Sequence, residues 1–156
     1  MTELLVAVLV IGVGALGAAG LQLASSKNTR SALEGTTAVI LAQDMAERLR
    51  ANPQGAYPGV AYGSTPPGFV DCLAANCTSS ELASFDVTVW KCSLGRWRAD
   101  SACGEARAAR ALPPEERQPG LPMGDGAIDW GANGEFTVSV TWQSAEERRV
   151  ALPGRR

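Results

Sequence analysis

The chain has 156 residues, of which 14 are basic and 16 are acidic, so its formal net charge is -2. This length builds one domain with a sizeable core, and the near-neutral charge argues against broad binding of polyanions. The sequence contains no histidine, which excludes Ser-His-Asp and Cys-His catalysis and zinc sites built on histidine.

The first predicted element is an apolar helix at the N-terminus. Residues 4–21 (LLVAVLVIGVGALGAAGL) carry no polar side chain. With its extension to residue 24, the segment forms roughly 27 to 32 Å of helix, the thickness of a bilayer's hydrocarbon core. A cleavable signal peptide begins with basic residues and has a shorter apolar stretch, whereas Met1-Thr2 supplies no basic residue. We therefore predict a retained membrane-spanning helix over about residues 4–24.

Two features of this helix have both an ordinary and a functional interpretation. Glu3 is either an interfacial acid favoured by the helix dipole or an ionisable group that seeks a cationic partner beside hydrocarbon. Glycines crowd the second half of the segment, at Gly12, Gly14, Gly17 and Gly20. They are either ordinary transmembrane composition or small residues that let helices of neighbouring copies approach closely.

The orientation signals disagree. Lys27 and Arg30 follow the apolar segment and, by the positive-inside rule, place the rest of the chain in the cytoplasm. Four cysteines favour an oxidising compartment instead, and we give them more weight: Cys72, Cys77, Cys92 and Cys103. Sequence proximity favours pairing Cys72 with Cys77 and Cys92 with Cys103, while a zinc site or free thiols are the alternatives.

The helical pattern continues beyond the apolar segment to about Ala51, where Asn52-Pro53 ends it. Leu33, Ile40, Leu41, Met45 and Leu49 form its expected apolar stripe. The predicted organisation is therefore an N-terminal helix over residues 1–52 and a globular head over residues 53–156.

The head begins with a loop over residues 53–71, rich in proline, glycine and tyrosine. A second helix is predicted over residues 79–94, because Thr78 and Glu81 have the spacing of a capping box. Its β-branched residues leave a short strand over 85–90 as the alternative. Residues 95–124 read as an irregular connection with a helical turn at 105–112.

The clearest strand runs from Glu135 to Trp142, where apolar and polar residues alternate strictly. Residues 127–130 and 148–152 are its expected neighbours, joined through the turns at 131–134 and 144–146. This pattern predicts an α+β protein in which a small antiparallel sheet of three or more strands covers the amphipathic half of the long helix.

Three polar constellations have a binding or catalytic interpretation beside an ordinary one. The oxygen-bearing side chains of Asp125, Asp129, Asn133 and Glu135 suit calcium but lack the spacing of an EF-hand, so we interpret them as turn residues. The basic segment Arg96-Trp97-Arg98, with Arg107 and Arg110, resembles a nucleic-acid patch, but neighbouring acids dilute it. Glu115-Glu116 is a poor catalytic acid pair, because adjacent carboxylates in a proline-flanked loop do not face one cleft.

The segment ELLVAVLVIGVGALGAAGLQLASSKNTRSA, followed by AQDMAERLRANP, resembles the N-terminal helix of type IV pilins, most closely the minor pilins of the type IV pilus modification (PilV) group. The resemblance covers residues 1–52 and continues loosely through CTSSELASFDVTVWK and GEFTVSVTW. It implies a pilin-like fold and a structural subunit of the pilus tip or priming complex, with no catalysis, cofactor or metal.

The resemblance also implies partners and a location. Glu3 matches the glutamate that in pilins pairs with the methylated N-terminal amine of a neighbouring subunit. The implied partners are other minor pilins and the major pilin through the N-terminal helix, a tip adhesin, and inner-membrane lipid before assembly, with no nucleic acid. The head then lies in the periplasm and later on the extracellular pilus.

Two further members of the wider class stay open as alternatives: a minor pseudopilin of a type II secretion system, with calcium near Asp125 to Glu135, and a DNA-uptake pilin that uses the Arg96 to Arg110 region.

In pilins a basic leader ending in glycine precedes the glutamate by a few residues. Only Met1 and Thr2 precede Glu3 here, so we expect either a truncated chain or a natural start upstream.

Overall fold

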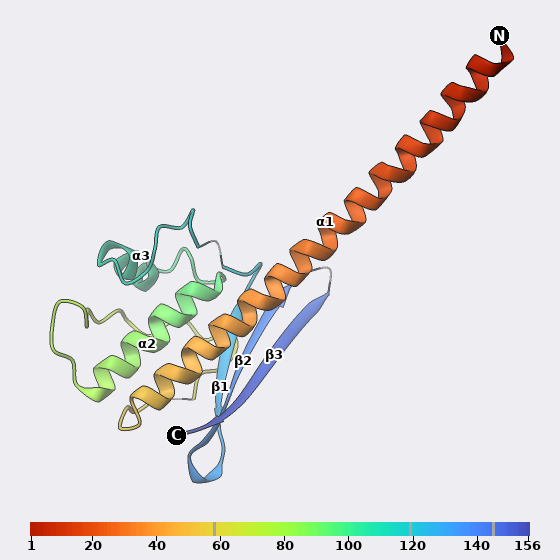
Figure 1. Cartoon of the computed structure of the whole chain (residues 1–156). Helices are drawn as coiled ribbons and strands as arrows, with labels where there is room; N and C mark the ends of the chain where they lie inside the picture. The colour runs from red at the N-terminus through yellow and green to blue at the C-terminus, as the bar shows by residue number, and fades with distance from the viewer. Residues whose placement is uncertain (58, 119, 145) are drawn as a thin grey trace. The chain divides into compact units, whose positions relative to one another are not determined.

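The computed structural model describes residues 1–57, 59–118, 120–144 and 146–156. Within these residues the elements follow in the order α1 (Thr2–Ala51), α2 (Ser79–Leu94), α3 (Ser101–Ala108), β1 (Asp125–Trp130), the 3₁₀ turn η1 (Ala132–Gly134), β2 (Glu135–Gln143) and β3 (Glu147–Arg155) (Figure 1). The layout is the predicted α+β arrangement. The chain divides into two compact units, Met1–Glu34 and Gly35–Arg156.

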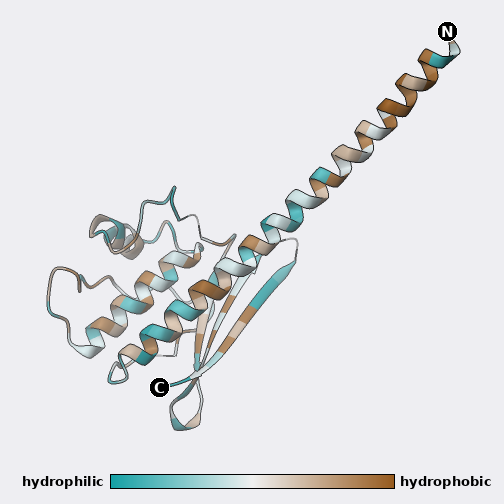
Figure 2. Ribbon diagram, in the orientation of Figure 1, coloured by the Kyte–Doolittle hydropathy of each residue, from teal (hydrophilic) through white to brown (hydrophobic). Residues whose placement is uncertain are grey.

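Helix α1 confirms the prediction of one helix from the N-terminus to Ala51. It ends where Pro53 removes the α conformation from the residue before it, and the amide of Asn52 still bonds to the carbonyl oxygen of Arg48 at 3.1 Å. By length and composition the apolar part of α1 is able to cross a membrane. In Figure 2 the N-terminal part of this helix is predominantly brown, the colour of hydrophobic residues.

The amphipathic part of α1 packs into the core of the second unit through six residues: Ala38, Leu41, Ala42, Met45, Ala46 and Leu49. Three of them are alanines, which bring the helix backbone close to its neighbours. The predicted stripe was wrong at Leu33 and Ile40, which are 63% and 57% exposed. The predicted stripe contained only large apolar residues at helical spacing, whereas alanines occupy much of the true contact face.

Helix α2 begins with the predicted capping box. The Thr78 hydroxyl accepts from the Glu81 amide, and the Glu81 carboxylate accepts from the Thr78 amide. The alternative of a strand over 85–90 was wrong, because these residues are helical. One side of α2 packs on α1 and the sheet, whereas Phe85, Val89 and Cys92 join a second cluster with Cys103 and Leu112.

Helix α3 corrects the prediction of a helical turn at 105–112. It begins four residues earlier, because the Asp100 side chain caps the amide of Ala102 at 2.9 Å. The end of the helix is followed by Arg110, which takes a left-handed backbone conformation with φ 63°. Leu112, which follows the end of the helix, is buried in the second cluster.

The sheet is a meander of antiparallel strands in the order β1-β2-β3. The alternation in β2 has its predicted effect, since Phe136, Val138, Val140 and Trp142 are buried in the core that α1 and α2 share. In β1 the same face carries Gly126, where an added Cβ would overlap the Trp90 ring. The strand therefore approaches α2 closely only because this position is a glycine.

Disulfides connect Cys72 with Cys77 and Cys92 with Cys103. This is the pairing that sequence proximity favours. The first bond closes a small loop just before α2, and the second ties the C-terminal part of α2 to α3. Both helices of the second cluster are thereby fixed to each other.

We expect each disulfide to contribute to the stability of the head, and the bond that closes the longer loop to contribute more. Replacing Cys92 and Cys103 by alanine lowers the free energy of unfolding by about 3 kcal/mol, and replacing Cys72 and Cys77 lowers it by about 2 kcal/mol. Urea unfolding of the detergent-solubilised chain measures both values. Equal melting temperatures with and without reductant would contradict this prediction.

Candidate assembly surface

The most unusual surface of the Met1–Glu34 unit is the apolar segment of α1. Every large apolar side chain between Leu4 and Leu23 is at least 61% exposed. A contiguous apolar surface of this length is not stable in contact with water. It therefore requires a cover of lipid or of apolar protein.

The predicted site residues lie at defined positions around this segment. At about 100° per residue the four glycines, Gly12, Gly14, Gly17 and Gly20, spread over about 200° of the helix circumference, so they do not form one narrow stripe. Glu3 and Gly14 are separated by just over three full turns, which places them on the same side. An added Cβ at any of the four glycines meets no atom of the described residues within 4 Å, so no contact that the structure describes requires these glycines.

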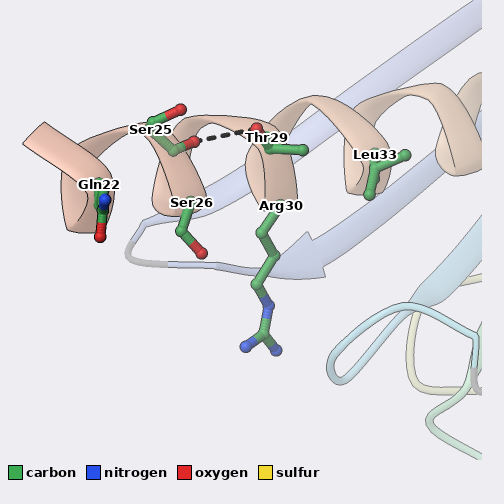
Figure 3. A pocket seen from close by; sticks show the side chains of 6 residues that line it. All are labelled: Gln22, Ser25, Ser26, Thr29, Arg30 and Leu33. Atoms are coloured by element: carbon green, nitrogen blue, oxygen red, sulfur yellow. Dashed lines mark hydrogen bonds between the residues drawn. The ribbon is translucent and has the colours of Figure 1, made fainter.

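A polar band follows the apolar segment (Figure 3). Gln22, Ser26 and Arg30 are four residues apart and point to the same side of α1, while the Thr29 hydroxyl donates to the carbonyl oxygen of Ser25 at 3.0 Å. The guanidinium of Arg30 lies 3.2 Å from the Glu34 carboxylate. The band gives the apolar segment a hydrophilic boundary of the kind found where a helix leaves a bilayer.

A first polar network in the second unit fixes the end of α1 to α2. The Arg48 guanidinium lies 2.9 Å from the Asp86 carboxylate, which also accepts from the Tyr57 hydroxyl at 2.6 Å. The side-chain amide of Asn52 donates to the backbone carbonyl oxygen of Ser79 at 2.7 Å. Burial and the hydrogen bond to Asp86 raise the pKa of Tyr57, so its hydroxyl stays protonated as a donor.

A second polar network is built around a buried ion pair. The Lys91 ammonium lies 2.7 Å from the Asp125 carboxylate, and the two side chains are 0% and 2% exposed. Lys91 also donates to the carbonyl oxygen of Ala61 at 3.0 Å. The amides of Gly63 and Gly126 donate to Asp125 at 2.7 and 2.8 Å. The network thereby joins α2, β1 and the loop before α2.

Opposing physical effects act on the pKa values of this pair. Burial acts to raise the pKa of Asp125, but the hydrogen bonds from Lys91, Gly63 and Gly126 outweigh it and hold the pKa below its ordinary value. Burial lowers the pKa of Lys91, against the attraction of Asp125. The 2.7 Å contact between Lys91 and Asp125 acts as a structural bridge between α2 and β1.

The other polar constellations of the sequence are engaged in the structure. Asp125 is held by Lys91. In the basic segment, Arg96 stacks on the Trp97 ring at 5.2 Å, and Arg98 lies 3.4 Å from Glu115. In the part of the chain that the structure describes, no three His, Cys, Asp or Glu side chains gather as metal ligands.

Sequence reasoning missed both polar networks. Asp86 and Lys91 belong to α2, whose apolar periodicity indicates contact faces but does not show that the polar side is also covered. Asp125 was assigned to a turn, although it begins β1. The one available signal was the early Pro/Gly-rich loop, which is long enough to cover that side of α2.

Comparison with known proteins finds one matching family model. Residues 20–88 match the model of the Tt1218-like family, described as type IV pilin Tt1218. The match takes in the polar band, the amphipathic part of α1, the following loop and much of α2. No curated protein and no solved structure matches the chain.

Proposed function

We propose that the chain is a type IV pilin, because residues 20–88 match the type IV pilin model, and more specifically that it is a minor pilin, a subunit of the tip or priming complex that promotes pilus assembly and displays an adhesin. Pilins are structural subunits that assemble with other pilus subunits, which agrees with an apolar N-terminal helix fit to anchor the chain in a membrane. The observation that carries the proposal is the exposed apolar segment joined to a head that contains two disulfides.

The apolar segment serves two environments in this proposal. Before assembly, residues 4–24 lie in the inner membrane and the head over residues 53–156 lies in the periplasm. During assembly, helices of other minor pilins and of the major pilin replace the lipid, and the head reaches the extracellular filament. Both environments are apolar, so the transfer of α1 from lipid to filament changes the hydrophobic free energy little. Close packing between helices therefore provides the main driving force for the transfer.

Glu3 supplies the specificity of that transfer in the proposal. A carboxylate beside hydrocarbon is costly unless an opposite charge neutralises it. We place the N-terminal amine of the adjacent subunit as that charge. Glu3 lies on the same side of α1 as Gly14 and Gly17. These small residues give the neighbouring helix room for close approach.

The polar networks of the head support the same function in a different way. Arg48, Asp86, Lys91 and Asp125 fix α1, α2 and β1 to one another. Force applied along a filament through α1 is thereby transmitted to the whole head. This arrangement suits a subunit that carries load and presents fixed loops to its neighbours.

The two alternatives have less support. A calcium-binding pseudopilin needs free carboxylates near residues 125–135, whereas Asp125 is committed to Lys91. A DNA-uptake pilin needs exposed, unpaired arginines in one patch, whereas Arg96 and Arg98 are engaged with carboxylates.

The replacement Glu3→Gln tests the proposal in the source cell. It keeps the size of the side chain and removes the charge, so we expect the amount of this chain in sheared surface filaments to fall at least about tenfold while its amount in the membrane stays unchanged. Glu47→Gln is the matched control, because it removes an exposed carboxylate from the same helix. Normal recovery of the Glu3→Gln chain in filaments would contradict the assigned role.

A further inference from the structure

The two edges of the sheet differ. The edge formed by β1 is partly covered, because Ile128 exchanges two backbone hydrogen bonds with Val60. The edge formed by β3 is open, since among the described residues β3 pairs with β2 alone over its nine residues. Figure 1 shows β3 as the outer strand of the sheet.

Two backbone hydrogen bonds of β2 and its flanking residues determine which backbone groups of β3 point outward. The Gly131 amide donates to the Glu135 carbonyl oxygen on the β1 side of β2, and the Arg156 amide donates to the Gly134 carbonyl oxygen on the β3 side. Hydrogen-bonded and non-hydrogen-bonded pairs alternate along an antiparallel ladder. The even-numbered residues of β3 therefore bond to β2, and the backbone groups of Glu147, Arg149, Ala151, Pro153 and Arg155 face the open edge.

The position of the proline agrees with this assignment. Pro153 has no amide hydrogen and is tolerated in a sheet where its nitrogen faces an open edge. At the outward position it leaves the ladder between β2 and β3 intact. Arg149 and Ala151 still offer both a donor and an acceptor to an incoming strand.

The sequence of this edge is complementary to itself. Residues 146–156 read EERRVALPGRR, with two acids at one end and two arginines at the other. We propose that β3 pairs antiparallel with β3 of a second copy of this chain, with Ala151 opposite Ala151. In this register Glu147 faces Arg155, Glu146 faces Arg156, and outward-facing backbone groups meet outward-facing backbone groups.

The charges select this register over its neighbours. Shifting the pairing by two residues in one direction places Arg149 opposite Arg155 and Arg148 opposite Arg156. The shift in the other direction places Glu147 opposite Pro153 and leaves all the acids without arginine partners. Opposite charges that face each other across strands stabilise a sheet and like charges destabilise it. Val150 also meets Leu152 of the other copy, and both are half-buried apolar residues.

The symmetry of the pair limits where it forms. Its twofold axis is perpendicular to the sheet, so the Gly35–Ala51 part of α1, which lies along the strands (Figure 1), runs in opposite directions in the two copies. Subunits of one filament share one direction. The pair therefore joins heads that approach from opposite sides, and its meaning as a contact between two filament tips rests on the proposed function.

Crosslinking of the full chain, held at one copy per lipid nanodisc, tests the pairing. All four native cysteines are in disulfides, so Ala151→Cys introduces a single reactive thiol. Hydrogen-bonded residues facing each other lie about 5.5 Å apart between Cα atoms, which suits a disulfide. We expect mild oxidation to dimerise this variant at least about tenfold faster than Ala108→Cys, a matched exposed alanine on α3.

A charge exchange then tests the register. Glu147→Arg and Arg155→Glu are each introduced beside Ala151→Cys. Each variant alone places like charges together at both ends of the pair, so its crosslinking slows by about fivefold or more. Mixing the two variants restores an opposite-charge pair at each end, and the rate of heterodimer formation recovers.

Two results would overturn the pairing: equal crosslinking of the Ala151→Cys and Ala108→Cys variants, or charge variants that crosslink equally well alone and mixed. In both cases the charges and Pro153 only protect the edge against association. The nanodisc experiment needs no pilus, so its failure is distinct from failure of the proposed function. Absence of the chain from filaments would leave the crosslinking result unchanged.

Discussion

We expect the replacement Lys91→Met to lower the free energy of unfolding by about 3–5 kcal/mol, the usual cost of removing one partner from a buried ion pair. The replacement keeps most of the side-chain volume but leaves the Asp125 carboxylate without its main counter-charge. Asp125 is 2% exposed, so water cannot take the place of the ammonium. Urea unfolding of the detergent-solubilised chain measures the loss.

A double-mutant cycle separates the ion pair from side-chain packing. Lys91→Met combined with Asp125→Asn removes both charges, so we expect it to cost clearly less than the sum of the single replacements. Arg98→Met is the control, because its pair with Glu115 is exposed and contributes at most about 1 kcal/mol. A loss below about 1 kcal/mol for Lys91→Met would contradict the structural role of the pair.

The same pair predicts a dependence of stability on pH. The pKa of Asp125 is lowered in the folded state, so the stabilisation is complete above the unfolded value near 3.8 and is lost as the pH falls through the lower folded value. We expect the stability difference between the natural chain and the variant with Lys91→Met and Asp125→Asn to shrink between pH 5 and pH 2. A constant difference over this range would contradict the prediction.

We expect the replacement Trp90→Ala to lower the free energy of unfolding by about 3–5 kcal/mol, the range for truncating a buried aromatic side chain. Trp90 is 0% exposed, and its indole donates to the carbonyl oxygen of Leu41 at 2.9 Å. The ring thereby connects α2 with α1 while it packs against Gly126 of β1. Circular dichroism during urea unfolding measures this loss without depending on tryptophan fluorescence.

The neighbouring glycine supplies a reciprocal test. In the natural chain Gly126→Ala forces its new Cβ into the Trp90 ring, so we expect a loss of about 1–3 kcal/mol. In the Trp90→Ala background the same methyl group enters an empty space and costs much less. Equal costs in both backgrounds would show that the ring and the strand are not in contact.

Sequence patterns predicted the elements wherever the determining signal is local. Pro53 ends α1, Thr78 and Glu81 begin α2, and strict alternation defines β2. Each of these signals acts through hydrogen bonds or backbone geometry within a few residues. They therefore work without knowledge of the rest of the fold.

The predictions that the structure corrects concern contacts between residues distant in sequence. The true contact face of α1 uses Ala38, Ala42 and Ala46, which a search for large apolar residues passes over. Lys91 looks like a solvent-exposed helix residue until the loop around Ala61 covers it. For the assembly surface, the sequence predicts the apolar segment and Glu3, but the open edge of β3 emerges only from the strand order and hydrogen-bond alternation.

Immunogold labelling of intact surface filaments from the source cell tests the minor-pilin role most directly. An epitope tag in an exposed loop of the head, with untagged cells as the control, reports where the chain lies. The proposed function predicts label confined to the filament tip, at a few copies per filament. Absence from filaments, or even label along their length, would contradict the assignment as a tip subunit.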